Sequence, residues 1–218
     1  MSEAARRAGR PPDSIQLIAV TKGRTLDEIR ALYDAGGRIM GENRVQEASG
    51  KIPSLPSDIE WHLIGHLQRN KARAAVQHFR MIHSVDSLRL GEELQKQAER
   101  TGVSLRILFE VNVSGEQSKF GFRPDEVGDA VRASARWPGL KLTGLMTMAP
   151  FEAIPEDTRP VFRALRELRD QLRAAVPGAQ GLEHLSMGMS NDFEVAIEEG
   201  ATMVRIGSAL FTEEGIAE

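Results

Sequence analysis

The sequence contains no cysteine, which excludes disulfide bridges, thiolate metal sites and cysteine nucleophiles. Its charges nearly cancel, with a net charge of -3 at pH 7, so no global field attracts nucleic acid or an anionic membrane surface. No apolar run approaches the roughly 18 residues that span a bilayer. The N-terminus, MSEAARRAGRPP, also lacks the apolar segment of a secretory signal. We therefore expect a cytoplasmic protein that binds neither nucleic acid nor a membrane.

What the sequence does contain is a repeated alternation of short β-rich runs and helix-like stretches. The clearest helix is predicted over 157–176, where apolar residues recur at helical spacing and Pro177-Gly178 follows. Strands that alternate with helices need crossover connections, and these make the sheet parallel. The eight expected strands are 15–22, 38–43, 60–65, 79–86, 105–113, 141–148, 184–189 and 203–211.

Eight such units in 218 residues favour a closed α/β fold, the (β/α)8 TIM barrel, whose lower size limit is about 200 residues. An open doubly wound sheet would more often carry a glycine fingerprint after its first strand, but this strand ends in Thr21-Lys22-Gly23-Arg24. Because no linker or change of composition interrupts the chain, we expect 1–218 to form a single domain. Few residues follow the last strand, so a helical segment over about 2–10 is expected to cover the gap left there.

In parallel barrels the active site lies at the C-terminal ends of the strands, which draws attention to Lys22. This lysine ends an otherwise apolar strand. An amine in apolar surroundings is a candidate nucleophile that could form a Schiff base with an aldehyde. The alternative is a lysine that extends from the barrel rim into solvent.

The last two strands end in serines and glycines that could hold a phosphate group. Ser186 and Ser190 begin and end the motif SMGMS, and Gly207-Ser208 opens a turn, at the loops where barrels frequently bind phosphate. Glycine lets backbone N–H groups approach phosphate oxygens and serine adds a hydroxyl donor, although ordinary turns use the same residues. Arg205, inside the last strand, needs a partner, which could be a surface carboxylate, a ring nitrogen or a phosphate.

Motifs along nearly the whole chain carry a resemblance to a known family. They are AVTK at 19–22, GENRVQE at 41–47, WHLIG at 61–65, SVDS at 84–87, VNVSGEQSKFGF at 111–122, GLMTM at 144–148, LSMGMSNDFEVAI at 185–197 and VRIG at 204–207. Together they resemble the YggS/PROSC family of pyridoxal 5'-phosphate (PLP) homeostasis proteins. The resemblance implies a barrel like the alanine racemase N-terminal domain, which is PLP fold type III. The site residues that it implies are Lys22 (Schiff base), Asn43 (beside the ring), Ser186, Gly207 and Ser208 (phosphate), and Arg205 (pyridine nitrogen).

The resemblance also implies a protein that holds PLP and releases or transfers it, without an established catalytic reaction. An arginine at the ring nitrogen, Arg205, would keep that nitrogen unprotonated and weaken the ring as an electron sink. The one tyrosine, Tyr33, is expected to pack in the first helix, so the second base of alanine racemase is missing. We therefore expect a monomeric carrier that is not an enzyme, with apo PLP-dependent enzymes as acceptors. The alternative is a one-base amino-acid racemase or decarboxylase acting through Lys22.

Three other patterns have alternative interpretations. Lys119 could act as a second amine during transfer of the aldehyde, or it could simply pair with Glu116. His62 and His66 have the spacing of a zinc site on a helix, but they fall on a predicted strand with no cysteine to assist, so no metal site is expected. The basic cluster at 69–73 is interpreted as a solvated helix face and not as an RNA site.

Overall fold

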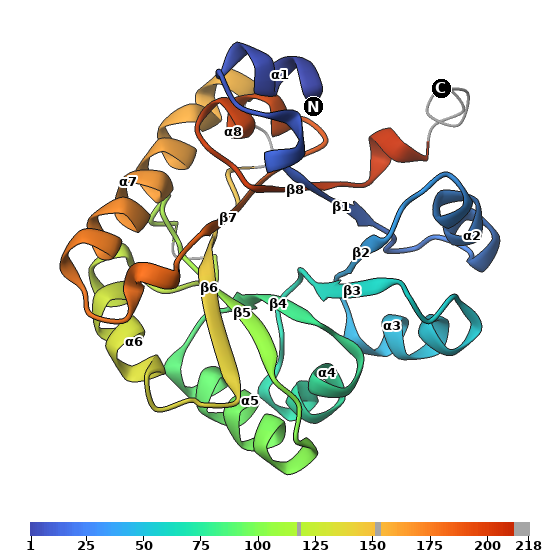
Figure 1. Ribbon diagram of the computed structural model, residues 1–218, viewed down its shortest axis with the longest axis horizontal. Coiled ribbons are helices and arrows are strands. Elements are labelled where there is room, and N and C mark those ends of the chain that lie inside the picture. The colour runs from blue at the N-terminus through green and yellow to red at the C-terminus, as the bar shows by residue number, and fades with distance from the viewer. Residues whose placement is uncertain (117–118, 151–153, 212–218) are drawn as a thin grey trace.

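The chain forms a closed barrel of parallel strands, in which each strand is hydrogen-bonded to the next in sequence order (Figure 1). The computed structural model describes residues 1–116, 119–150 and 154–211. Within these residues the predicted (β/α)8 barrel and its eight strands are confirmed. The strands are β1 (Gln16–Val20), β2 (Ile39–Glu42), β3 (Glu60–Leu63), β4 (Met81–Val85), β5 (Leu105–Glu110), β6 (Leu140–Met146), β7 (His184–Met189) and β8 (Met203–Ile206).

Helices surround the barrel and connect its strands (Figure 1). They are α1 (Ser2–Arg7), α2 (Leu26–Asp34), α3 (Val45–Lys51), α4 (Ala72–His78), α5 (Leu88–Thr101), α6 (Val127–Ser134), α7 (Arg159–Ala175) and α8 (Phe193–Glu198). Thr25 and Glu28 form a capping box at the start of α2, and Ser87 caps α5, which ends at Gly102 with a φ of 68°. None of the helices in the described ranges is both long enough and apolar enough to cross a membrane.

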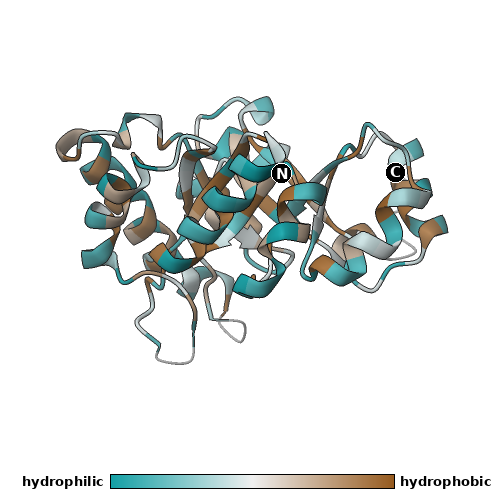
Figure 2. Ribbon diagram, turned by 90° about the horizontal axis from the view of Figure 1, so that it is seen from below, coloured by the Kyte–Doolittle hydropathy of each residue, from teal (hydrophilic) through white to brown (hydrophobic). Residues whose placement is uncertain are grey.

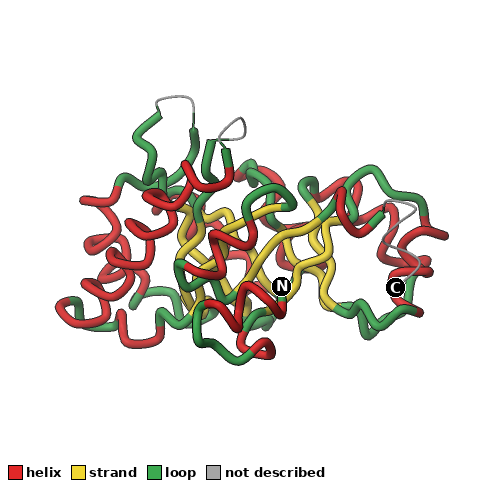
Figure 3. The backbone as a smooth tube through the Cα atoms, turned by 90° about the horizontal axis from the view of Figure 1, so that it is seen from above, coloured by secondary structure: helices red, strands yellow, loops and turns green. Residues whose placement is uncertain are grey.

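The strand side chains alternate between two packed regions. Those that face the helices belong to the larger hydrophobic core, and the second region is a smaller apolar cluster on the barrel axis. Figure 2 shows hydrophobic residues gathered on the central strands, and Figure 3 shows these strands side by side, enclosed by helices. The axial cluster consists of Ile18, Val20, Ile64, Met81, Leu108, Met146 and Met203. Buried polar residues on the same strands are His62, His83, Glu110, Ser186 and Arg205.

All strands but the seventh are shorter than predicted, and the early ends of the fifth and the eighth have a visible cause. The fifth, expected over 105–113, ends at Glu110, because the chain beyond it pairs with Phe122 through Val111 and Asn112. The eighth, expected over 203–211, ends at Ile206. Gly207 leaves the extended conformation, with φ of -125° and ψ of -75°, and a 3-10 turn follows. Because both strands end early, polar residues expected in strands lie in loops at the C-terminal ends of the strands, here called the barrel mouth.

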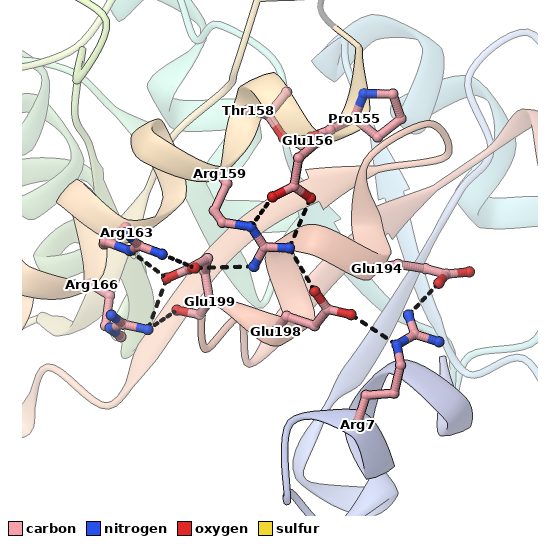
Figure 4. A network of polar contacts seen from close by, with 10 residues as sticks. All are labelled: Arg7, Pro155, Glu156, Thr158, Arg159, Arg163, Arg166, Glu194, Glu198 and Glu199. Atoms are coloured by element: carbon pink, nitrogen blue, oxygen red, sulfur yellow. Dashed lines mark hydrogen bonds and ion pairs between the residues drawn. The ribbon is translucent and has the colours of Figure 1, made fainter.

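The N-terminal segment is helical, as expected, and α1 lies at one side of the gap that was expected outside β8 and β1, two strands that are themselves hydrogen-bonded. It packs against α8, with Ala5 fully buried. Arg7 pairs with Glu194 at 2.5 Å and with Glu198 at 2.9 Å, and both carboxylates belong to α8 (Figure 4). On the other side of the gap, the outer face of β1 and the helix α2 border a groove of about 810 Å³.

Candidate functional site

Lys22 lies in the turn just beyond the C-terminal end of β1. Two residues before it, Val20, with Ile18, belongs to the axial cluster, so the lysine follows directly on the part of β1 that lines the barrel. The lysine side chain is exposed, so its amine is accessible from solvent at the barrel mouth. The structure thus places the predicted lysine where a ligand entering the barrel would meet it.

A buried polar cluster on the outer side of β1 holds the chain beside Lys22. The Thr21 hydroxyl donates to Glu42 Oε1 at 2.7 Å. The Lys51 ammonium donates to the same carboxylate oxygen at 2.8 Å and to the Thr21 carbonyl at 2.9 Å. Because Glu42 is fully buried, these contacts fix the ends of β1 and β2 relative to each other.

Asn43 lies at the neighbouring strand end. Val20 of β1 is in register with Gly41 of β2, so Asn43, further along the same strand face, is level with Lys22. A Cβ on Gly65 would lie 2.5 Å from the Asn43 carbonyl oxygen, which means that only glycine fits against this backbone. The close packing of Gly65 therefore fixes the half-buried Asn43 beside the lysine.

Arg205 is a buried cation whose direct partners are neutral. It is 4% exposed, and its Nη1 and Nη2 donate to Ser186 Oγ at 2.7 Å and to the Thr147 carbonyl at 3.0 Å. Burial lowers the pKa of Arg205 to about 10, against the opposing charges of Asp192 and Glu110, so it remains charged at neutral pH. Burying a cation without a contacting anion is costly. The arrangement suits a ligand that brings a hydrogen-bond acceptor or a negative charge.

Ser186 lies below the mouth, with its hydroxyl committed to protein partners. The residue is fully buried, and its Oγ lies 2.8 Å from His83 Nδ1 in addition to its contact with Arg205. Since an arginine can only donate, the hydroxyl accepts from Arg205, and the direction of its bond to His83 depends on the tautomer of that histidine. The phosphate role that the resemblance implies for Ser186, with Gly207 and Ser208, stays a prediction.

A set of anion donors forms where β7 and β8 end. The Gly207 N–H donates to Ser190 Oγ at 3.2 Å, and Ser208 is exposed at the start of the next turn. A Cβ on Gly207 would lie 3.2 Å from Val20 Cβ, which leaves little room for a larger residue. Because β8 pairs with β1, these donors lie beside the strand that carries Lys22. Serine hydroxyls and a backbone amide at a glycine are suited to phosphate oxygens.

The opposite side of the mouth carries a buried acid that sequence reasoning missed. Glu110, the last residue of β5, is 4% exposed, and its Oε2 finds no hydrogen-bond partner among the described residues. Burial and then the charge of Asp86 raise the pKa of Glu110 to about 7, although Arg205 opposes the shift. Asp86 itself pairs with His66 at 3.1 Å. The signal in the sequence is a single glutamate between apolar residues of a predicted strand.

His62 and His66, weighed above as metal ligands, do not share a site. His62 lies inside the barrel, 3.0 Å from His83 and 2.8 Å from Glu60. His66 lies at the mouth and stacks on Phe120, with 3.7 Å between ring centroids. In the part of the chain that the structure describes, no group of three or more histidine and carboxylate side chains could hold a metal ion.

Tyr33 and Lys119 both lie in protein contacts. Tyr33 packs against the core, and its hydroxyl is bonded to the Asp58 carboxylate at 2.8 Å on the outer side of the barrel. Lys119 pairs with Glu116 at 2.7 Å, which is the alternative that the sequence left open for this lysine. Neither contact adds a reactive group to those beside Lys22.

Known proteins resemble the chain over almost its full length. The family model described as the alanine racemase N-terminal domain matches residues 2–214. A pyridoxal phosphate homeostasis protein of Aquifex aeolicus is 45% identical over 214 residues, which cover 98% of this chain and 93% of the relative. A protein of the same name from Pseudomonas aeruginosa is 43% identical over 216 residues, with 96% and 89% covered.

Solved structures share the barrel. PipY of Synechococcus elongatus, solved with PLP bound, is 39% identical with a TM-score of 0.84, and the match covers 96% of this chain and 98% of PipY. The same protein without PLP gives a TM-score of 0.88. Alanine racemase from Corynebacterium glutamicum is 17% identical with a TM-score of 0.73, and the match covers 95% of this chain but 58% of that enzyme. This last likeness shows a common fold.

Proposed function

The chain belongs to the family of pyridoxal phosphate homeostasis proteins, as its motifs predict, and we propose that it binds PLP at the barrel mouth and later releases or transfers it. The observation that carries the proposal is Arg205, a buried cation with neutral partners, on the strand next to the one that ends at Lys22. When bound, PLP supplies an aldehyde that reacts with an amine, and a ring nitrogen that accepts a hydrogen bond. The mouth presents a group for each.

In this proposal the ring and the aldehyde are held by three strand ends. Lys22 forms a Schiff base with the aldehyde, because its amine is exposed just beyond the barrel-lining part of the first strand. Asn43 lies beside the ring, level with the lysine. Arg205 donates to the pyridine nitrogen with an N–H that neither Ser186 nor Thr147 uses.

The phosphate is held by the donors at the ends of β7 and β8. These are the backbone N–H of Gly207 and the hydroxyls of Ser190 and Ser208. The Ser186 hydroxyl is already bonded to Arg205 and to His83, so we assign Ser186 to supporting Arg205. Ser190 then takes the phosphate contact that the resemblance implies for Ser186.

The protein acts as a carrier in this proposal. Arg205, with a pKa of about 10, keeps its proton at neutral pH, so the ring nitrogen would accept a hydrogen bond without being protonated. An unprotonated ring is a weaker electron sink. Tyr33, bonded to Asp58 outside the barrel, is not placed to act as a second base. We propose that residues 1–218 work as one monomeric unit in the cytoplasm and supply PLP to apo enzymes.

One observation favours a second candidate, a one-base racemase or decarboxylase. Glu110 is a buried acid at the mouth with a pKa of about 7, which is the range expected of a general acid or base. A one-base enzyme acting through Lys22 would gain in Glu110 a second group that exchanges protons near neutral pH. Assays for turnover separate this candidate from the carrier.

The test is a PLP titration of the apo protein and of two variants. Lys22→Ala should abolish the visible absorption of the bound cofactor, whereas Lys141→Ala, an exposed lysine in β6, should leave it unchanged. The loaded protein should restore activity to an apo PLP-dependent enzyme and should not turn over single-enantiomer amino acids. Binding that survives Lys22→Ala would refute the proposed site. Sustained racemisation or decarboxylation that Lys22→Ala abolishes would establish the second candidate.

A further inference from the structure

Beneath Arg205, a single file of hydrogen-bonded side chains, here called the interior line, runs through the barrel. Ser186 Oγ is 2.7 Å from Arg205 Nη1 and 2.8 Å from His83 Nδ1. His83 Nε2 is 3.0 Å from His62 Nδ1, and His62 Nε2 is 2.8 Å from Glu60 Oε1. The three middle residues are fully buried. Glu60, at the start of β3 and therefore at the end of the barrel opposite the mouth, is 34% exposed.

The ionised carboxylate at one end of the interior line, together with two neutral histidines, fixes the direction of the hydrogen bonds in it. Arg205 can only donate, and an ionised Glu60 can only accept. The hydrogen bond from His62 is the main cause that lowers the pKa of Glu60 to about 2, so this carboxylate is ionised at neutral pH. Ser186 must therefore donate its proton to His83 Nδ1. His83 then donates from Nε2 to His62, and His62 donates from Nε2 to Glu60.

The surroundings keep both histidines neutral. Burial lowers the pKa of His62, against the hydrogen bond from the carboxylate. Burial lowers the pKa of His83 still further, and the charges of Arg205 on β8 and Arg106 on β5 act in the same direction. His184 on β7 also faces them, and burial lowers its pKa as well. A neutral imidazole has one donor and one acceptor nitrogen, which is the combination that the interior line requires.

We propose that His83 and His62 are positioning residues for the PLP site, an inference that rests on the proposed function. The interior line turns the Ser186 oxygen toward Arg205 as an acceptor, and so holds the guanidinium with its remaining N–H groups available to the ring nitrogen. The carboxylate at the far end of the line, Glu60, is paired with Arg106 and lies away from the guanidinium of Arg205. Arg205 therefore meets its ligand as an oriented cation with no anion in contact.

The direction of the interior line can be measured in the apo protein from the 15N chemical shifts of the imidazole nitrogens. We expect His62 and His83 to carry their protons on Nε2 and to be neutral at neutral pH, because burial lowers the pKa of both. Ser186→Ala should shift the His83 Nδ1 signal, because that nitrogen loses its donor. A proton on Nδ1 of either ring would overturn the interior line, whether or not PLP binds.

The role toward the ligand can be measured with PLP and its carbocyclic analogue, in which a C–H replaces the ring nitrogen. His83→Leu removes two bonds of the line and should weaken PLP binding about tenfold, as expected for one hydrogen bond, without weakening the analogue. His83→Gln can accept from Ser186 and donate to His62, so it should recover most of the affinity. His184→Leu changes an interior histidine outside the line and is the matched control.

The outcomes separate this inference from the proposed function. An equal loss of affinity for PLP and for the analogue in His83→Leu, or no loss for either, would overturn the positioning role. If His83→Leu does not fold, His83→Gln and Ser186→Ala decide: the preference for PLP over the analogue should persist in the first and decrease in the second. Absence of PLP binding in the unmodified protein would refute the proposed function and the role together. Binding of PLP without a preference over the analogue would refute the contact of Arg205 with the ring nitrogen and the positioning role, while PLP binding itself would stand.

Discussion

The interior line and the ion pairs among the outer helices are two charged networks of opposite construction. The interior line is a single file, in which Ser186, His83 and His62 each connect one neighbour to the next. The outer network joins α1, α7 and α8, and half of its members have several partners (Figure 4). Its charged members are Arg7, Glu156, Arg159, Arg163, Arg166, Glu194, Glu198 and Glu199.

The difference shows that the cost of losing one partner depends on how many other partners a polar residue has and on how deeply it is buried. Glu199 contacts three arginines, at 3.1 Å (Arg159), 3.0 Å (Arg163) and 3.0 Å (Arg166). Burial alone would raise the pKa of Glu199, but hydrogen bonds from Arg163 and Arg159 lower it. Losing one partner there leaves two others. In the interior line, a lost partner leaves a buried polar group without a hydrogen bond. The interior line therefore orients the side chains in it, whereas the outer network holds the helices together through ion pairs that can replace one another.

The largest effect is expected from Glu110, the interior acid, because its pH dependence has the opposite sign to that of the outer carboxylates. Its folded-state pKa, about 7, lies above the ordinary value of 4.5, so the folded protein binds a proton that the unfolded chain has released. The free energy of unfolding should therefore fall as pH rises through this range, by on the order of 3 kcal/mol. Glu110→Gln should remove the fall in urea unfolding experiments across pH.

The outer network supplies the contrast for that measurement. The pKa of Glu199 is lowered, so its contribution to stability is present above the ordinary pKa of a glutamate and is lost as pH falls through the folded-state value. Glu110→Gln should leave this acid limb of the stability profile unchanged. A profile that is the same with and without Glu110 would contradict the assignment of a raised pKa to this carboxyl.

The next effect concerns one link of the interior line. Ser186→Ala leaves a donor of Arg205 and the Nδ1 acceptor of His83 without a partner in a buried site, which should cost about 2 kcal/mol of unfolding free energy. Ser134→Ala is the matched control, because the Ser134 hydroxyl bonds to a carbonyl of its own helix. If urea unfolding gives the same loss for the two variants, the interior line is not held together as described.

The smallest effect is expected in the outer network. Arg163→Ala removes one of three arginines around Glu199, and its cost in unfolding free energy should be smaller than that of Ser186→Ala, because Arg163 is exposed and two arginines remain. Added salt should reduce the difference further, since screening weakens exposed ion pairs. A loss equal to that of Ser186→Ala, and insensitive to salt, would remove the distinction between the two networks.

The sequence predicts the barrel and the place of Lys22 for the same reason. Strand alternation and the position of active sites at strand ends are local rules, and both can be applied to IQLIAVTK without knowing any other strand. The placement of Asn43 and of Gly207-Ser208 at strand ends follows from the same rules. These predictions needed only the order of the strands.

The interior line could not be predicted in this way. Ser186 and His83 are 103 residues apart, and their contact depends on how β4 and β7 are staggered across the barrel. The register between β7 and β8 also shifts between Ser186 and Met189, which no local pattern indicates. Glu110 was missed because its burial results from strands that close over it from both sides. Both features are properties of the closed barrel and not of any segment.

Borohydride reduction of the PLP-loaded protein, followed by peptide mapping, tests most directly whether the barrel mouth holds the cofactor on Lys22. The adduct is expected on the peptide that contains Lys22 and should be absent from the Lys22→Ala variant. Ser190→Ala and Arg205→Met should lower the amount of adduct formed at limiting PLP, since each removes a proposed cofactor contact. An adduct found only on another lysine, such as Lys119, would contradict the site.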